Sequence, residues 1–241
     1  MEDSKTIRQV RSALEQEPRI EFHPHRVKVA VDPDGAVVLE GELPSIAAKK
    51  LALRCAAAVS GVSGIVDRLR VTPSKPMGDG EIRDHVRNAI VEEPAFDQCG
   101  IQTEESGHWR TFREATATPR CSIDIAVDDG VVTLGGQVTS LSEKRLAGVL
   151  AWWVPGSREV INGLEVSPAQ EDSDDEITEA VKLALEKDRL LNADRVRVRT
   201  SAAVVTLEGL VANDAESRMA EMDAWYVIGV DRVDNRLECE R

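Results

Sequence analysis

Two histidines, His23 and His25, are separated by one proline and are the first residues that could do chemistry, since two imidazoles can bind one metal ion. No cluster of carboxylates or thiols accompanies them, and a closed metal site needs further ligands. The other two histidines, His85 and His108, have no partner that the sequence identifies. No Ser-His-Asp or Cys-His arrangement can be proposed. We therefore predict no catalytic residues, no metal site and no cofactor, and we expect the chain not to be an enzyme.

The four cysteines are the remaining candidates for reactive or metal-binding groups. They are widely spaced and never form a CxxC pair, whereas zinc sites and small disulfide scaffolds group their cysteines closely. We therefore predict four reduced thiols, three of them at apolar positions of predicted elements: Cys55, Cys99, Cys121 and Cys239.

Aromatic residues make up only 3% of the chain, yet two pairs occupy matching positions in repeated segments. A helical wheel places these rings well away from the expected core face. Exposed rings at matching positions indicate a contact surface between repeats, between subunits or toward a ligand. The alternative is that the helix ends before Pro155 and the rings fold over the sheet edge. The candidate residues are Trp152, Trp153, Trp225 and Tyr226.

A third aromatic group lies in an insert of the second repeat, at about residues 96–120. Trp109 and Phe112 stand there among polar residues, and loops of this length are often functional or disordered. We predict an extra hairpin that docks on a neighbour and count both rings among the interface residues.

These aromatic residues belong to a threefold repeat. Segments 36–71, 131–166 and 204–239 align without a gap, and each carries two glycines 20 residues apart. Glycine is expected where a strand or helix end strains the backbone, so we assign these glycines a structural role. They are Gly41 and Gly61, Gly136 and Gly156, and Gly209 and Gly229.

Upstream of each segment, apolar residues three or four positions apart predict a helix, and alternating apolar residues then predict two strands. Asp79, Ser140, Ser173 and Asn213 stand where helix N-caps belong. Asp129-Gly130 predicts a tight hairpin turn, for which the third repeat has no glycine. The unit reads α-β-β-α-β, a small three-stranded mixed sheet packed by two helices. The predicted α/β (α+β) chain has domains at 1–72, 79–167 and 173–241.

The net charge of −13 argues against nucleic acid as a partner. It is unevenly distributed, at +2 for residues 1–76, −7 for 77–168 and −8 for 169–241. No apolar run is long enough to span a membrane, and no signal peptide is recognised. These features favour a cytoplasmic location, with peripheral membrane association left open.

The combined pattern resembles the BON domain (bacterial OsmY and nodulation). The second repeat carries it most fully, at Asp129, Gly130, Val132, Leu134, Gly136, Ala147, Gly156, Val160, Asn162 and Leu164. The third repeat keeps Asn235, whereas the first has Asp67 at this position. The resemblance covers nearly the whole chain apart from the insert and the linkers.

The resemblance implies a non-catalytic module of envelope, osmotic-stress or transport-associated proteins, with proposed roles in lipid or other ligand binding and in assembly. The family that the chain resembles includes one cytoplasmic member that binds potassium. We therefore predict a triple-BON protein that works by self-association as a homo-oligomer. Two alternatives stay open: a sensor of a small molecule, ion or lipid headgroup, and a transport-associated assembly at the membrane.

Overall fold

The computed structural model describes residues 2–20, 27–116 and 121–240, so the His23 and His25 pair lies outside the described residues. The chain divides into two compact units, residues 1–72 and 73–241. The first unit holds one α-β-β-α-β domain and the second holds two. The predicted α+β class with three small mixed sheets is therefore confirmed.

The first domain contains two long helices and one three-stranded sheet of order β1-β2-β3. Strands β1 and β2 are antiparallel and form the predicted hairpin, while β2 and β3 are parallel. Residues that alternate toward the helices, such as Val29 and Leu39, are buried. The elements are α1 (Glu2–Glu15), the 3-10 helix η1 (Pro18–Ile20), β1 (Val27–Val31), β2 (Val37–Leu43), α2 (Ile46–Ala57) and β3 (Ile65–Val71).

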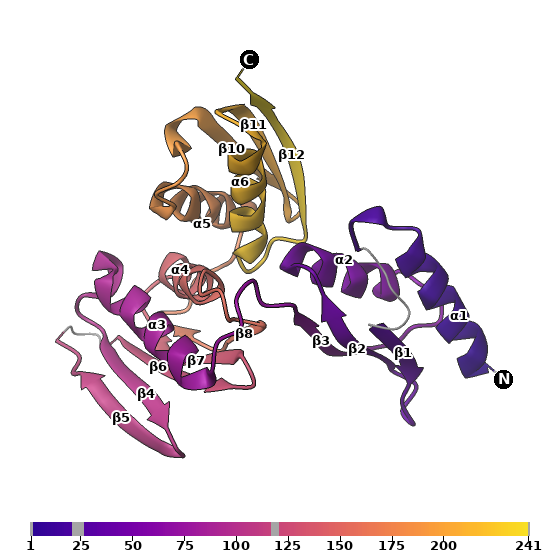
Figure 1. The fold of residues 1–241 in the computed structure, drawn as a ribbon, viewed down its shortest axis with the longest axis horizontal. Coiled ribbons are helices and arrows are strands. Elements are labelled where there is room, and N and C mark those ends of the chain that lie inside the picture. Colours follow the sequence, from indigo (N-terminus) through magenta and orange to yellow (C-terminus); the bar gives the residue numbers. More distant parts are fainter. Residues whose placement is uncertain (1, 21–26, 117–120, 241) are drawn as a thin grey trace. The chain divides into compact units, whose positions relative to one another are not determined.

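The second domain has its own sheet of the same kind, and the insert extends that sheet by the hairpin β4–β5. The sheet order is β5-β4-β6-β7-β8, and β9 pairs with β7. Helices α3 and α4 cover one face of this sheet (Figure 1). The elements are α3 (Asp79–Glu92), η2 (Pro94–Phe96), β4 (Gly100–Glu105), β5 (His108–Arg113), β6 (Ser122–Asp128), β7 (Val131–Val138), α4 (Leu141–Trp152), β8 (Glu159–Asn162) and β9 (Glu165–Val166).

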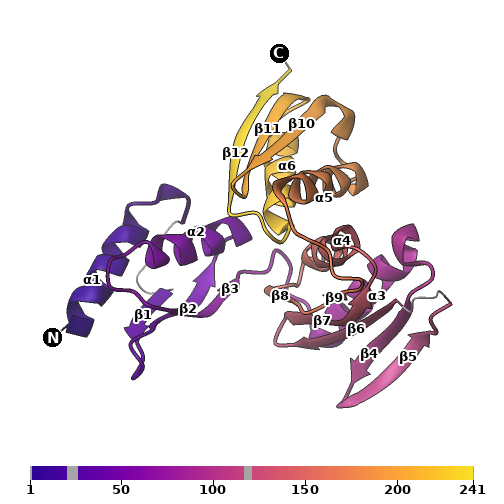
Figure 2. The same ribbon diagram turned by 180° about the vertical axis from the view of Figure 1, so that it is seen from behind.

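The third domain returns to three strands, in the order β10-β11-β12 (Figure 2). Its hairpin β10–β11 is antiparallel, and β11 and β12 are parallel. The elements are α5 (Asp174–Lys187), η3 (Ala193–Arg195), β10 (Val196–Ser201), β11 (Val204–Val211), α6 (Asp214–Tyr226) and β12 (Arg232–Cys239).

Three of the four predicted N-caps are confirmed. Asn213 Oδ1 accepts from the Glu216 amide at the start of α6. Ser140 Oγ accepts from the Glu143 amide and Ser173 Oγ from the Glu176 amide. The prediction for Asp79 is wrong, because Gly78 is the N-cap of α3. Asp79 begins the helix instead, and its carboxylate faces the β6–β7 turn.

That carboxylate joins the start of helix α3 to the β6–β7 hairpin by two hydrogen bonds. Asp79 Oδ2 and Oδ1 accept from the amides of Asp129 and Gly130, at 3.1 and 2.8 Å. Asp174 does the same in the third domain, accepting from the two residues of the β10–β11 turn at 2.7 and 2.9 Å. The carboxylate satisfies two turn amides that the strand ladder leaves free.

The β10–β11 turn adopts the glycine-favouring conformation without a glycine. Ala202 and Ala203 have φ of 49° and 59°, as Asp129 and Gly130 have 48° and 71° in the second domain. A two-residue hairpin turn of this kind needs positive φ at both positions, which alanine adopts only with strain. The two hydrogen bonds that the Asp174 carboxylate accepts from this turn offset part of that strain.

Two glycines, Gly136 and Gly209, allow one strand to approach the next very closely. A Cβ atom on Gly136 would lie 2.3 Å from Ser122 O, and one on Gly209 would lie 2.0 Å from Arg195 O. Both have positive φ, at 100° and 137°. Gly156 serves a different purpose, since its φ is not positive and a Cβ there would meet Ile82 and Met77. Its role is close packing against α3.

An asparagine ties the last strand to the second helix in two of the domains. Asn162 Nδ2 donates to Lys144 O at 2.6 Å, and Asn235 Nδ2 donates to Ser217 O at 3.1 Å. In each case Oδ1 accepts an amide two residues later in the chain. The side chain therefore bonds to both the helix and the sheet.

The first domain replaces this asparagine by a charged pair. Asp67 Oδ2 lies 3.0 Å from Lys49 Nζ, and Lys49 is only 4% exposed. Lys49 Nζ also donates to Leu69 O at 3.1 Å. Burial lowers the pKa of Lys49, and the hydrogen bond with Asp67 opposes that shift. The aspartate in the first repeat is thus matched by a lysine on the facing helix.

We predict that Ala203→Gly raises the free energy of unfolding by about 1 kcal/mol, because glycine adopts positive φ without a Cβ clash. Urea unfolding followed by tryptophan fluorescence measures it. The matched control is Gly130→Ala in the second domain, which should destabilise. An unchanged or lower midpoint for Ala203→Gly would show that Asp174 already removes the strain.

We predict that Asp67→Asn lowers the stability of the first domain by about 2 kcal/mol, because it leaves a buried ammonium without its carboxylate. The double variant Lys49→Met with Asp67→Asn should recover most of this loss. Residues 1–72 contain no Trp or Tyr, so urea unfolding followed by far-UV circular dichroism should detect the change. Tryptophan fluorescence, which reports residues 73–241, should not. Equal stability of both variants would contradict the role given to the pair.

Candidate functional site

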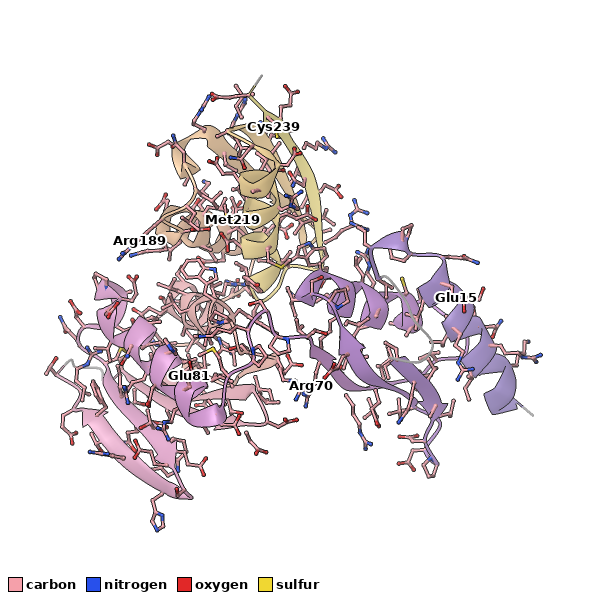
Figure 3. The ribbon with its side chains drawn as sticks, in the orientation of Figure 1. Glu15, Arg70, Glu81, Arg189, Met219 and Cys239 are labelled. Atoms are coloured by element: carbon pink, nitrogen blue, oxygen red, sulfur yellow. A yellow bond between two sulfur atoms is a disulfide. The ribbon has the colours of Figure 1, made fainter. Side chains whose placement is uncertain are left out.

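The predicted aromatic residues lie where the second and third domains meet. Helix α4 packs against α5 and α6, and side chains fill the space between them (Figure 3). The rings of Trp152 and Tyr226 stack at 5.7 Å between centroids with an interplanar angle of 12°. Their contact is between repeats, one of the three settings the sequence left open.

The expectation that these rings are exposed is wrong. Trp152 is 9% exposed, Trp225 is fully buried, and Trp153 and Tyr226 are half-buried. The helical wheel allowed each helix one buried face, toward its own sheet. In the structure α4 has a second buried face, which packs against the third domain.

We call the contact of α4 with α5 and α6 the joint between the second and third domains. A carboxylate in this joint contacts the indole of Trp153. Trp153 Nε1 donates to Asp223 Oδ1 at 2.8 Å, and Asp223 is only 4% exposed. Its other oxygen, Oδ2, is buried and has no hydrogen-bond partner among the described residues. Burial raises the pKa of Asp223 to about 7, opposed by the Trp153 hydrogen bond and assisted by the nearby Asp188 carboxylate.

Arg145 holds the same joint from the start of α4. Its guanidinium is almost fully buried, with Nη2 at 2.6 and 2.7 Å from the two carboxylate oxygens of Asp172. Nε donates to Ile228 O at 3.0 Å. One side chain of the second domain therefore binds both the linker between β9 and α5 (residues 167–173) and the loop that follows α6. Lys187 Nζ adds a bond to Glu93 Oε1 at 2.7 Å.

Sequence reasoning missed Arg145, Asp172 and Asp223. Their residue types are common on exposed helices and linkers, and nothing in their spacing distinguishes them from surface charge. The signal that pointed to this region was the paired aromatic residues.

The insert forms the predicted hairpin, and its outer strand is exposed. Strand β5 is the edge of the sheet, pairing antiparallel with β4. Trp109 is 54% and Phe112 is 52% exposed. Trp109 pairs with Glu104, on the face away from the helices, whereas Phe112 lies under the Arg87 guanidinium of α3 at 4.7 Å. The strand thus has an aromatic ring on each face of the sheet.

The prediction of four reduced thiols is wrong for two of them. Cys99 and Cys121 form a disulfide that joins the start of β4 to the start of β6, while Cys55 and Cys239 are free. Because 22 residues separate the pair in sequence, spacing gave no sign of it. The parallel pairing of β4 with β6 brings the two residues together.

Within residues 2–20, 27–116 and 121–240, no three His, Cys, Asp or Glu side chains come close enough to hold a metal ion. Among the same residues, no helix combines the length and apolar character needed to cross a bilayer.

The geometry defines a class of protein: tandem α-β-β-α-β domains, each a small mixed sheet packed by two helices. The family model of the BON domain matches residues 2–73, 114–168 and 173–241. The chain belongs to the BON domain family, as the sequence pattern predicted. The matches leave out residues 74–113, which include α3 and the β4–β5 hairpin.

Among curated proteins, the chain is similar to osmotically-inducible protein Y of Escherichia coli (strain K12), with 35% identity over 122 residues. The match covers 48% of this chain and 61% of that protein, less than two thirds of its length.

Two solved structures of CdsD, a structural protein of the type III secretion system of Chlamydia trachomatis, also match, each at 14% identity. The first, of its C-terminal domain, has a TM-score of 0.26 and covers 98% of this chain and 97% of that one. The second has a TM-score of 0.24 and covers 97% and 91%.

We predict that acid stabilises the joint through Asp223. Its folded pKa of about 7 lies above its ordinary 3.8, so the folded state binds the proton more tightly. Stability should fall as the pH rises from about 4 to 7, by up to about 1.4 kcal/mol per unit, and then level off.

Urea unfolding by tryptophan fluorescence at several pH values tests this prediction. Asp223→Asn keeps an acceptor for Trp153 without the charge. It should flatten this part of the profile and raise stability at pH 8. Asp188→Asn, which removes only the neighbouring charge, should have a smaller effect. An unaltered profile in Asp223→Asn would show that another group titrates.

Proposed function

We propose that this chain is a non-enzymatic assembly protein of the osmotic-stress response, which works by self-association. The observation that carries the proposal is the exposed aromatic edge strand β5. The rings of Trp152, Trp153, Trp225 and Tyr226 pack within the chain. Among the described residues this leaves Trp109 and Phe112 as the exposed aromatic pair that a second copy can contact.

An edge strand offers unpaired amides and carbonyls to another strand. Two copies of β5 can pair antiparallel about Thr111, which leaves both sheets continuous. Arg110 of each copy then comes opposite Phe112 of the other, the same cation and ring combination that Arg87 and Phe112 form within the chain. Trp109 comes opposite Arg113, and no like charges face each other.

The net charge links this association to osmotic conditions. Copies that carry −13 repel each other at low ionic strength. Salt screens the repulsion, with a Debye length that falls from about 30 Å at 0.01 M to about 8 Å at 0.15 M. The likeness to osmotically-inducible protein Y supports a role in this response. The Cys99–Cys121 disulfide favours an oxidising compartment over the cytoplasm predicted from the sequence.

We predict that raised salt shifts the mass of the native chain from 26.4 kDa toward twice that value, whereas an equal osmolality of sucrose does so less. Sedimentation velocity over a concentration series measures this. Thr111→Lys should keep the chain monomeric, because two lysines would face each other across the pair and Thr111 is exposed.

Thr111→Val is the matched control and should associate as the native chain does. A native chain that stays monomeric at every salt concentration would overturn self-association. A Thr111→Lys variant that still associates would show that β5 is not the interface.

A further inference from the structure

The third domain has an open sheet edge where the second domain has an extra strand. Among the described residues β10 pairs only with β11, so its other edge is free. A hollow of about 330 Å³ lies between this edge and α5. Its lining includes Leu185 and Glu186 of α5 and Val196, Arg197, Val198 and Arg199 of β10.

Comparison with the second domain shows which element occupies the equivalent sheet edge there. Val196 and Val198 of β10 correspond to Ile123 and Ile125 of β6, as their pairing with the equivalent glycine strands shows. Strand β4 runs parallel to β6 there, with Ile101 beside Ile123.

The helix side of the site is equivalent as well. Leu185 of α5 stands where α3 has Ile90, and α3 packs on β4. The β4 residues that face the helix, Ile101 and Thr103, are buried. Val196 is half-buried, whereas its counterpart Ile123 is fully buried under β4.

We propose that the groove between α5 and β10 binds an extended acidic peptide segment of another protein, which adds to β10 in parallel as β4 adds to β6. Main-chain hydrogen bonds to the free edge hold such a strand, and alternate side chains give it specificity. The helix-facing positions take β-branched side chains that can be buried, as Ile101 and Thr103 of β4 are.

Positive charge on the face of β10 that points away from α5 favours an acidic peptide. Arg197 and Arg199 stand where β6 has Asp124 and Ala126, and neither arginine makes an ion pair among the described residues. In the second domain Gln102 of β4 lies beside Asp124. A strand on β10 would place that position beside Arg197, and the next position of the same face near Arg199. Carboxylates fit both positions.

The test uses a labelled peptide copied from residues 99–106 with Cys99→Ser and Gln102→Glu, added to the full chain that carries Thr111→Lys. That background separates this site from self-association through β5, so the failure of one proposal does not affect the other. Fluorescence anisotropy measures the affinity. Backbone amide shifts locate the site and should concentrate on residues 196–200 and 182–186.

We expect saturable binding that weakens at least tenfold in the variant Arg197→Glu with Arg199→Glu. A peptide with lysine in place of residues 102 and 104 should regain affinity for that variant. Lys5→Glu with Arg11→Glu makes the same change in net charge in the first domain and should leave binding unchanged. A peptide with Ile101→Asp should bind at least tenfold more weakly.

Absence of binding, or binding that the two charge reversals affect equally, overturns the proposal. So does a second result: self-association of the Thr111→Lys chain that Arg197→Glu with Arg199→Glu abolishes. In that case the edge of β10 takes a second copy instead of a peptide.

Discussion

The arrangement of the second and third domains depends on one buried guanidinium. Arg145 is nearly inaccessible to water, so its charge must be matched inside the joint. Asp172, from the linker before α5, binds Nη2, and the carbonyl of Ile228, from the loop after α6, binds Nε. Nη1 is buried without a hydrogen-bond partner among the described residues. Removing any of these groups leaves a buried charge poorly compensated. The aromatic stack and the Trp153 to Asp223 bond add to a joint whose geometry the guanidinium already restricts.

This joint explains why α4 differs from an ordinary amphipathic helix, which has one buried face and one exposed face. One face of α4 covers the second domain's sheet, where Ala147 and Ala151 are fully buried. Trp152 and Arg145 lie on the side that meets the third domain. A helix buried on both sides contributes to two cores, so a substitution in α4 is expected to affect both domains together.

Much of the fold followed from periodicity and glycine. Alternating apolar residues gave the strands, and capping serines gave the starts of α4 and α5, because these are local interactions between residues close in sequence. The Cys99–Cys121 disulfide and the Asp79 contact with the hairpin turn could not be found this way. Both join residues brought together by strand order, and no local pattern records them. The buried state of Trp152 and Trp225 likewise depends on a neighbouring domain, which a helical wheel of one segment leaves out.

The three domains therefore share one fold and differ mainly at their edges. In the second domain the insert covers the edge of β6 with β4, and a disulfide fixes the added strand at its start. The unpaired edge is thereby moved outward to β5, which has an aromatic ring on each face. In the third domain the equivalent edge, β10, has no strand beside it in the part of the chain that the structure describes, and it has two arginines where the second domain has an aspartate and an alanine. An unpaired strand edge is the feature of a sheet most able to accept another chain. Because the interior side chains of each domain pack within it, differences between copies at these edges are the part of the molecule that can give each domain its own partner.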